Sequence, residues 1–556
     1  MVMEETERNL REKIEQEAKN TLKKTMWEGY ANDILTGLQK NPGVQPDRPI
    51  WELVQNARDV AYENKKAKIV FIRKQDHFVF QHNGQPFTRT TLQSLILQTS
   101  SKVREDIIQV GQYGTGFLTT HKFGLDFRLS GSLSLLEGLK FYNFSGRDFI
   151  IKRSAQDKVK LSDDLDATIA KTQQWGLDLN SLEDNPRRET IFEYQHNFNA
   201  ERENAKIAIK EAPKLVPYVL ALNKHIESIS FIDEVEGPKE ESFTFQNEEI
   251  YDNLENLRVY ETTILHSQSG QKDKIISLFL LKSLRCLEEK TGESKFTIIL
   301  PLKKISEGLK VFNFDNSIPR LYLYLPLLGS KDWGCNFLFH SPSFTCDQDS
   351  RDSIMLRFNP QAEVHHDQIN KDIIREASDA LKKYLTYKYL NLTDARFLCP
   401  INFVKGKSDN ETNQYYQELQ KEWVSFFECL NLVEYEDGKT IPVKSIRVLS
   451  NELYLACEQD VSLLDAIYNL LSKAVHLILP RKEELLFWTK VINEWYEDNE
   501  AENLHIISID SLVSLIQETT ITESDLDWLH KLCYYFKNNG HADYLNKPII
   551  PNEEYS

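Results

Sequence analysis

Three polar side chains, Glu52, Asn56 and Asp59, recur along the segment "IWELVQNARDVA" at spacings of four and three residues. A helix has about 3.6 residues per turn, so these spacings place all three on one narrow stripe. Leu53 and Ala57 belong to the neighbouring apolar stripe, which we expect to face a core. The polar stripe should then be half-buried, where a carboxylate and an amide need a partner such as a bound ligand or metal ion.

Two further motifs follow along the chain. The tripeptide "HNG" at 82–84 ends an alternating, strand-like segment, and "VGQYGTGF" carries Gly111, Gly114 and Gly116 before a helical run. Glycines let backbone N–H groups approach a phosphate closely at a helix N-terminus. The order G-x-x-G-x-G, without a strand directly before it, is not a Rossmann fingerprint. Taken singly, "NG" is also typical of a hairpin turn, and glycine-rich segments are usually only turns.

The three motifs in this order, within residues 52–117, resemble those of the GHKL ATPases, which include gyrase B, MutL, histidine kinases and the ninety-kilodalton heat-shock chaperones. "RPIWELVQNARD", "HNGQPF" and "GQYGTGF" are most similar to sacsin-like and heat-shock-chaperone-like ATPases. The resemblance is specific over about 40–200 and looser over 320–352. It implies a Bergerat-fold α/β sandwich with ATP and Mg²⁺ as ligands and ATP hydrolysis as the activity.

The resemblance assigns roles on the first helix. Glu52 matches the glutamate that activates the attacking water, and a carboxylate can accept that proton. Asn56 matches the Mg²⁺ ligand, since an amide oxygen is a hard donor. Asp59 matches a position that supports the site. A mobile lid is expected at about 88–113, where Lys102 would neutralise phosphate; a salt-bridged glutamate and a solvated lysine are the alternatives.

Further nucleotide contacts are implied along the glycine loop and on a later strand. They are Gly111, Tyr113, Gly114, Thr115, Gly116 and Phe117 in the loop, and Thr190 in "ETIFEY". Arg351 in "DSRDS" is the expected catalytic basic residue, reaching the γ-phosphate from the following domain. A guanidinium suits that role because it stays charged and binds phosphate with two hydrogen bonds. Arg320 and Lys331 are rivals, and an ordinary surface ion pair is the alternative.

The second motif departs from the family, which has an aspartate where His82 stands. That aspartate accepts a hydrogen bond from the adenine amino group, and a neutral imidazole can do the same through its unprotonated nitrogen. ATP affinity should then fall as the pH drops through a histidine pKa near its ordinary value of about 6.5. Asn83 or a water molecule are alternative readers of the base, and Gly84 permits close approach of the ligand.

Hydrophobic patterning predicts an α+β protein of several domains. We expect an N-terminal segment, 1–40, of two helices. The Bergerat-fold α/β sandwich, 41–200, should hold a β-hairpin over "AKIVFIRKQDHFVFQHNGQPF" and helices on one face of a mixed sheet. A transducer-like α/β domain, 201–360, and a largely helical region, 361–556, should follow. The stretch "AQDKVKLSDDLDATIAKTQQWGLDLNSLEDNPRR" is expected to be a polar connection.

Composition limits the cell compartment and the partners. The 556 residues carry 67 basic and 84 acidic side chains, a formal net charge of −17, which argues against direct nucleic-acid binding while leaving a local basic patch open. Apolar runs are too short to span a bilayer, no signal peptide is evident, and the scattered cysteines fit reduced thiols. A cytoplasmic protein without membrane contact is expected.

Four functions compete on the sequence alone. The leading hypothesis is a chaperone-like ATPase switch acting on a protein client or partner subunit, with a homodimer as an open alternative. The others are the ATPase or sensor of an antiviral defence or DNA-transaction system, a degenerate nucleotide-binding scaffold kept open by His82, and a kinase. The kinase is disfavoured because no phospho-acceptor histidine helix is evident. The chain is also compatible with being the N-terminal part of a longer protein.

Overall fold

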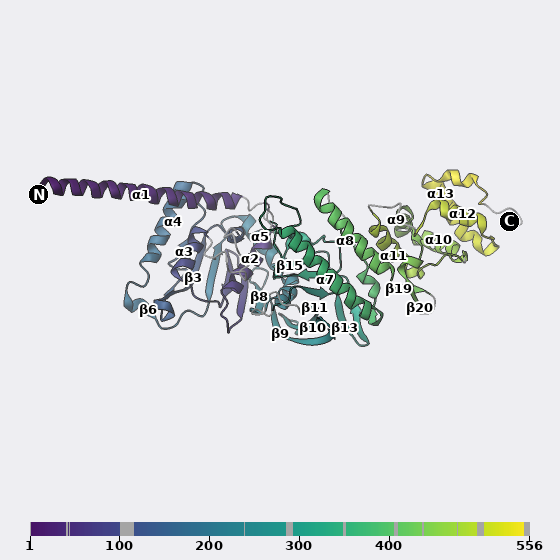
Figure 1. The fold of residues 1–556 in the computed structure, drawn as a ribbon, viewed down its shortest axis with the longest axis horizontal. Coiled ribbons are helices and arrows are strands. Elements are labelled where there is room, and N and C mark those ends of the chain that lie inside the picture. The colour runs from purple at the N-terminus through teal and green to yellow at the C-terminus, as the bar shows by residue number, and fades with distance from the viewer. Residues whose placement is uncertain are drawn as a thin grey trace.

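The structure is a computed structural model that describes residues 2–39, 43, 45–99, 116–237, 239–284, 293–347, 352–404, 410–435, 439–474, 476–497 and 505–549. It is mixed α and β, as predicted, with one large mixed sheet and many helices. The sheet occupies the middle of an elongated molecule, with a long helix at the N-terminal end and a helical bundle at the C-terminal end (Figure 1). No helix within the described ranges is both long and apolar enough to cross a bilayer.

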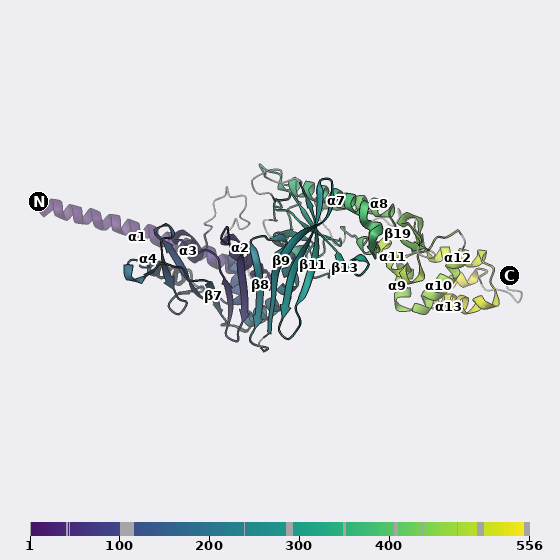
Figure 2. The same cartoon turned by 90° about the horizontal axis from the view of Figure 1, so that it is seen from below.

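The large sheet has 15 strands in the order β16-β15-β17-β12-β11-β10-β9-β8-β1-β2-β7-β3-β4-β6, with β5 paired to β3. Their bounds are β1 Ala67–Arg73, β2 His77–His82, β3 Phe127–Leu135, β4 Lys140–Phe144, β5 Ile150–Ile151, β6 Leu182–Glu183, β7 Thr190–Gln195, β8 Ile226–Asp233, β9 Lys239–Leu254, β10 Leu257–Gln268, β11 Lys274–Ser283, β12 Thr297–Leu300, β15 Leu321–Leu323, β16 Leu325–Pro326 and β17 Leu338–His340. β1 pairs antiparallel with β2 and parallel with β8. The sheet therefore continues across residue 200, where a domain boundary is predicted (Figure 2).

The helices and the small sheets account for the rest of the regular structure. The helices are α1 Val2–Gln39, α2 Arg48–Asp59, α3 Arg89–Leu97, α4 Lys158–Gln173, α5 Asn199–Glu211, α6 Val216–Leu222, α7 His366–Lys388, α8 Asn410–Glu428, α9 Asn451–Gln459, α10 Val461–Lys473, α11 Lys482–Trp495, α12 Ile509–Glu518 and α13 Leu526–Asn538. The small sheets contain β13 Leu302–Ile305, β14 Gly308–Val311 and β18 Leu392–Thr393; β19 Asn431–Tyr435 and β20 Lys439–Pro442; and β21 Val448–Leu449 and β22 Ile506–Ile507. C-terminal to residue 361 the chain is mainly helical, as expected.

The predicted hairpin is confirmed as β1 and β2, closed by the Lys74 N–H donating to the His77 carbonyl at 3.0 Å. Alternate side chains of β1 point into the core, and the Phe71 ring lies 5.4 Å from that of Phe80 on β2. Lys68, on the opposite face of β1, is exposed. α2 and α5 contact β1, so helices cover one face of this part of the sheet, as predicted.

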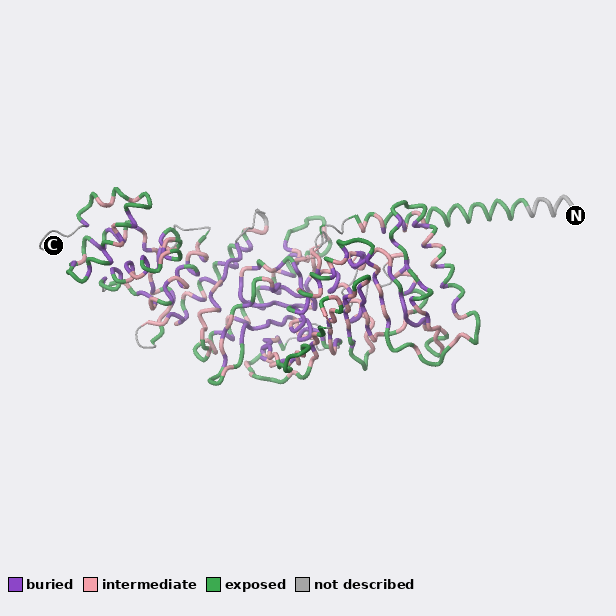
Figure 3. Tube along the Cα trace, turned by 180° about the vertical axis from the view of Figure 1, so that it is seen from behind, coloured by how far each residue is buried: buried purple, intermediate pink, exposed green. Residues whose placement is uncertain are grey.

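The N-terminal segment differs from the prediction of two helices, because α1 is one continuous helix of 38 residues. Gly29 does not break it, and a Cβ there would meet no atom within 4 Å. The outer part of α1 is exposed and extends beyond the body (Figures 1 and 3). Its inner part packs on α4, where Lys23 Nζ lies 2.8 Å from Asp166 Oδ1 and Lys158 Nζ lies 3.2 Å from Glu28 Oε2.

α4 lies within the stretch that the sequence predicts to be a polar connection, so that expectation is wrong. Its buried face holds Leu161, Leu165 and Ile169, which recur every four residues. Asp157 caps its N-terminus by accepting hydrogen bonds from the Val159 and Lys160 N–H groups at 2.9 and 3.0 Å. An apolar side chain once per turn is enough to dock a helix on a neighbour, although it gives little signal in an otherwise charged segment.

The hydrophobic side chains form three cores. The first runs from α1 and α2 through the sheet to β17, and the second joins β10–β12 to α7, α8 and α11. The third, built from residues 449–549, belongs to the C-terminal bundle. The predicted boundaries near 200 and 360 stay predictions, since the first two cores each draw side chains from both sides of one of them.

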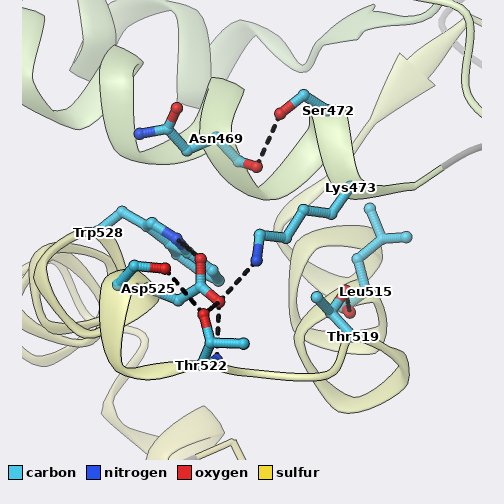
Figure 4. Close-up of polar contacts among 9 residues, drawn as sticks. Asn469, Ser472, Lys473, Leu515, Thr519, Thr522, Asp525 and Trp528 are labelled. Atoms are coloured by element: carbon cyan, nitrogen blue, oxygen red, sulfur yellow. Dashed lines mark hydrogen bonds and ion pairs between the residues drawn. The ribbon is translucent and has the colours of Figure 1, made fainter.

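The C-terminal bundle contains a buried polar joint centred on Asp525 (Figure 4). Its carboxylate accepts from Lys473 Nζ of α10 at 2.6 Å, from the Thr522 N–H at 2.8 Å and from Trp528 Nε1 of α13 at 2.9 Å. Burial alone would raise the pKa of this carboxyl, but these hydrogen bonds outweigh it and hold the pKa well below its usual range. The ionised aspartate thereby ties α10 to the start of α13.

Candidate functional site

The polar stripe predicted on α2 lies where expected. Glu52 and Asn56 are half-buried one turn apart, while Leu53 and Ala57 are fully buried beneath them. Pro49 occupies the first turn of the helix, where proline needs no backbone donor. The Asn56 side chain makes no hydrogen bond to any described residue, so its amide oxygen is available to a ligand.

Asp59 lies at the far end of the stripe and has a different setting. Its Oδ1 is 3.6 Å from Nη1 of Arg58, and its side chain is almost fully buried. The guanidinium carbon of Arg58 lies 3.9 Å from the centre of the Tyr324 ring, a cation–π contact with the loop between β15 and β16. Asp59 therefore belongs to a packed joint between α2 and that loop.

The third motif meets the first at Gly116. A Cβ built on Gly116 would lie 2.1 Å from Oε2 of Glu52, closer than any side chain can approach. Only glycine fits there, and its backbone lies directly against the Glu52 carboxylate, 64 residues away in the sequence. Phe117 instead packs among core rings, 6.0 Å from Phe127 and 6.1 Å from Phe192. Gly116 and Phe117 begin a 3-10 helix, Gly116–Phe123, rather than a regular α-helix.

Several predicted site residues lie outside the described residues. They are Lys102, Gly111, Tyr113, Gly114, Thr115 and Arg351, together with the part of the predicted lid from residue 100 onward. The described part of that lid contains α3, whose N-terminus is capped by Thr88. The rest of the glycine loop and the expected arginine stay predictions.

The "HNG" motif divides into three roles. Asn83 Oδ1 accepts from the Lys68 N–H at 2.7 Å, so this side chain fastens the motif to the edge of β1. Gly84 is needed for close packing, because a Cβ there would lie 2.6 Å from Val60 Cγ2 and 2.8 Å from the Val60 carbonyl oxygen. His82 is buried on the helix-covered face of β2, on which Phe80 also lies.

His82 and Thr190 lie directly opposite each other on β2 and β7, and both are buried. Burial lowers the pKa of His82 from 6.5 to about 4, so the ring is neutral at physiological pH. The expected fall in affinity near pH 6.5 is therefore wrong: protonation, and any loss of binding that depends on it, belongs near pH 4. The sequence could not show this, because the burial comes from the packing of three strands and α2.

His82 has one protein partner for its ring nitrogens. The Gly84 N–H donates to Nδ1 at 3.1 Å, and Nε2 makes no hydrogen bond to a described residue. The expectation that the ring offers an unprotonated nitrogen to adenine also needs correction. In the neutral tautomer set by Gly84, Nδ1 is already used as the acceptor and Nε2 carries the proton.

The rivals to Arg351 separate clearly. Arg320 is buried, and its guanidinium donates to the backbone carbonyls of Cys335 at 2.8 Å and of Ile318. Arg320 therefore closes a loop and is not free for phosphate. Lys331 lies beside the start of α2, where its Nζ donates to Gln45 Oε1 at 3.3 Å.

Arg48 and Asp352 are polar residues of the site that the sequence analysis does not single out. Nη2 of Arg48 lies 3.5 Å from Glu52 Oε1, and Nη1 of the same guanidinium contacts Asp352 Oδ1. Asp352 is fixed in turn by its carbonyl, which accepts from the Gly329 N–H at 2.8 Å. The i,i+4 spacing of Arg48 and Glu52 is a signal readable in the sequence. Asp352 is 304 residues from Arg48, and no local pattern joins them.

Comparison with known proteins does not add to this geometry. No protein-family model and no curated protein matches the chain. Among the described residues, no group of three or more His, Cys, Asp and Glu side chains is placed to hold a metal ion by itself. The arrangement of Glu52, Asn56, Gly116, His82 and Thr190 is therefore the basis for a functional assignment.

Proposed function

We propose that this chain is a Mg²⁺-dependent hydrolase of purine nucleoside triphosphates and a nucleotide-driven conformational switch of the GHKL type, with ATP as the ligand that the resemblance implies. The observation that carries the proposal is the contact between the Glu52 carboxylate and the backbone of Gly116. It joins a candidate general base to the end of a candidate phosphate loop. The His82–Thr190 pair supplies a buried polar position for the base.

In this proposal Glu52 receives the proton from the water that attacks the γ-phosphate. Arg48 holds one oxygen of the Glu52 carboxylate from the preceding turn of α2, and Gly116 leaves room for the other. Asn56 would hold Mg²⁺, which fits its unpaired, half-buried amide and the preference of this ion for one or two protein ligands plus phosphate oxygens and water. When bound, the ion would neutralise phosphate charge.

The switch would act through the two ends of α2. Arg48 at its N-terminus contacts Asp352, and Arg58 at its C-terminus stacks on Tyr324. Both partners belong to the 320–352 region of the chain, so a displacement of that region would be felt by the helix that carries Glu52 and Asn56. A protein client or a partner subunit would receive the motion, and the C-terminal bundle offers a separate body to carry it.

Phosphate release from Mg·ATP by wild-type protein, Glu52→Ala and Glu52→Gln tests the proposal. We expect hydrolysis by the wild type and at least a hundredfold loss in both variants, with nucleotide binding retained, since only the proton acceptor is removed. Glu63→Ala, an exposed glutamate just beyond α2, is the matched control and should hydrolyse at the wild-type rate. Equal turnover by wild type and both Glu52 variants would remove Glu52 from catalysis.

A non-hydrolysing nucleotide-binding scaffold is the second candidate. Two observations favour it: Glu52 faces the guanidinium of Arg48, which competes for the carboxylate, and His82 replaces the aspartate found in the family. Binding of Mg·ATP by calorimetry together with no phosphate release above that of Glu52→Ala would select the scaffold over the hydrolase.

A further inference from the structure

His82 presents a hydrogen-bond donor at the position where an acceptor is expected. A backbone N–H can only donate, so the 3.1 Å contact between the Gly84 nitrogen and Nδ1 of His82 makes Nδ1 the acceptor. The neutral imidazole has one proton, which must then be on Nε2. The ring therefore offers N–H to whatever lies beyond it.

The tautomer is locked by the packing around Gly84. The backbone of this glycine is pressed against Val60 at the end of α2, since a Cβ on Gly84 would be 2.6 Å from Val60 Cγ2. The neighbouring Gln85 N–H donates to the Val60 carbonyl at 2.7 Å and fixes the same turn. Rotating the Gly84 N–H away from His82 would break this turn, so the ring cannot exchange its donor and acceptor nitrogens at low cost.

The protonated nitrogen lacks a partner in the protein. His82 is 5% exposed, and no described residue accepts a hydrogen bond from Nε2. An almost buried N–H without an acceptor is unfavourable, and a bound ligand with a lone pair at this point would relieve it. Burial keeps the pKa of the ring near 4, so the donor pattern does not change across the physiological range.

Purine bases differ at this point in their chemistry. Adenine carries an amino group at position 6, which is a donor, whereas guanine and hypoxanthine carry a carbonyl oxygen, which is an acceptor. Building on the nucleotide site proposed above, we infer that His82 selects 6-oxopurine nucleotides over adenine nucleotides by donating Nε2–H to the O6 atom. The same residue makes an amino group at position 6 a donor facing a donor.

Equilibrium binding of ADP, GDP and IDP to the full chain tests this without turnover. In calorimetry with Mg²⁺ at pH 7.5, we expect IDP and GDP to bind about tenfold tighter than ADP, the effect of one buried hydrogen bond made rather than left unmade. IDP lacks the 2-amino group of GDP, so it isolates the contribution of O6. ADP binding as tightly as IDP in the wild type would overturn the inference, including an approach of adenine through its N1 acceptor.

Variants of His82 give a second arm. His82→Asp restores an acceptor and should reverse the order, with ADP about tenfold tighter than IDP, while His82→Asn offers both groups and should bring the two within about twofold. Thermal melts report whether each variant is folded, and the wild-type comparison stands without them. An unchanged order in a folded His82→Asp protein overturns the inference. Failure of all three diphosphates to bind the wild type would overturn the proposed nucleotide site as well.

Discussion

At the scale of single residues, Asn56 is the side chain whose role can be isolated most cleanly. It shares the Glu52 stripe, is half-buried and makes no hydrogen bond to a described residue. Its replacement therefore removes a potential ligand without breaking a protein contact. Most losses in this variant should then be losses of ligand binding rather than of folding.

We expect Asn56→Ala to weaken binding of Mg·ATP about tenfold and to leave binding of ATP in excess EDTA nearly unchanged, because the amide oxygen acts through the ion. Calorimetric titrations with and without Mg²⁺ measure the difference. Gln55→Ala is the matched control, since this amide is on the same helix but off the Glu52 stripe. Equal losses with and without Mg²⁺ would show that Asn56 is not the ion's ligand.

At the scale of elements, α2 is held at both ends by side chains from the 320–352 region. The Arg48–Asp352 pair is substantially shielded, with side chains 12% and 28% exposed. Burial raises the pKa of the Asp352 carboxyl, and the positive charge of Arg48 opposes that rise. A pair in this setting contributes more than an exposed one, and it lies next to the candidate catalytic carboxylate.

We expect Arg48→Ala and Asp352→Asn each to lower kcat for ATP several-fold with a smaller change in KM, because both would loosen Glu52 rather than remove a nucleotide contact. A double-mutant cycle on kcat should give a coupling of about 1 kcal/mol between the two residues. The Arg375–Asp372 pair on α7 is the control, since its side chains are 49% and 52% exposed and its cycle should give almost none. Additive effects at Arg48 and Asp352 would mean that they act separately.

The elements that the sequence predicts correctly have strong local patterns. The α2 stripe and the β1–β2 hairpin each read out within a dozen residues, and Pro49 marks the start of the helix. α4 escapes because its buried face uses one apolar residue per turn. The long strands β9–β11 give no clean alternation, since Ile250 and Ile275 on them are exposed. Their pairing depends on partners elsewhere in the sheet.

The site shows the same division between local and distant information. The stripe at Glu52 and Asn56 follows from helix geometry, and its approach to Gly116 is implied by the family resemblance. The neutral state of His82 depends on burial, and its tautomer depends on a turn packed against Val60. Asp352 reaches Arg48 only through the fold. Spacing identifies candidate residues, but protonation and long-range pairing need the packed structure.

At the scale of the whole molecule, the C-terminal bundle has its own core and its own polar joint. Asp525 is ionised and buried, so removing it leaves Lys473 and Trp528 without their acceptor. We expect Asp525→Ala to destabilise the bundle by about 3 kcal/mol, the cost of breaking a buried charged contact. Differential scanning calorimetry measures it, and nucleotide binding by the rest of the chain should be unchanged.

The pH dependence of that stability has a defined sign. The pKa of Asp525 is lower in the folded bundle than in the unfolded chain, so its contribution is complete above the unfolded value of about 3.9 and is lost as the pH falls below it. Wild type and Asp525→Ala should therefore converge in bundle stability in acid and differ fully at pH 6. Asp543→Ala, at an exposed aspartate in the same region, is the control. A difference between wild type and Asp525→Ala that is constant with pH would contradict the ionised joint.

The arrangement of the large sheet has a consequence for self-association. A sheet of 15 strands would be an aggregation hazard if it ended in long, flat edge strands with free N–H and C=O groups. Its terminal strands are β6, Leu182–Glu183, and β16, Leu325–Pro326, each only two residues long. Pro326 has no N–H to donate. The chain thus carries an extensive hydrogen-bonded ladder whose two ends offer another molecule almost nothing to extend.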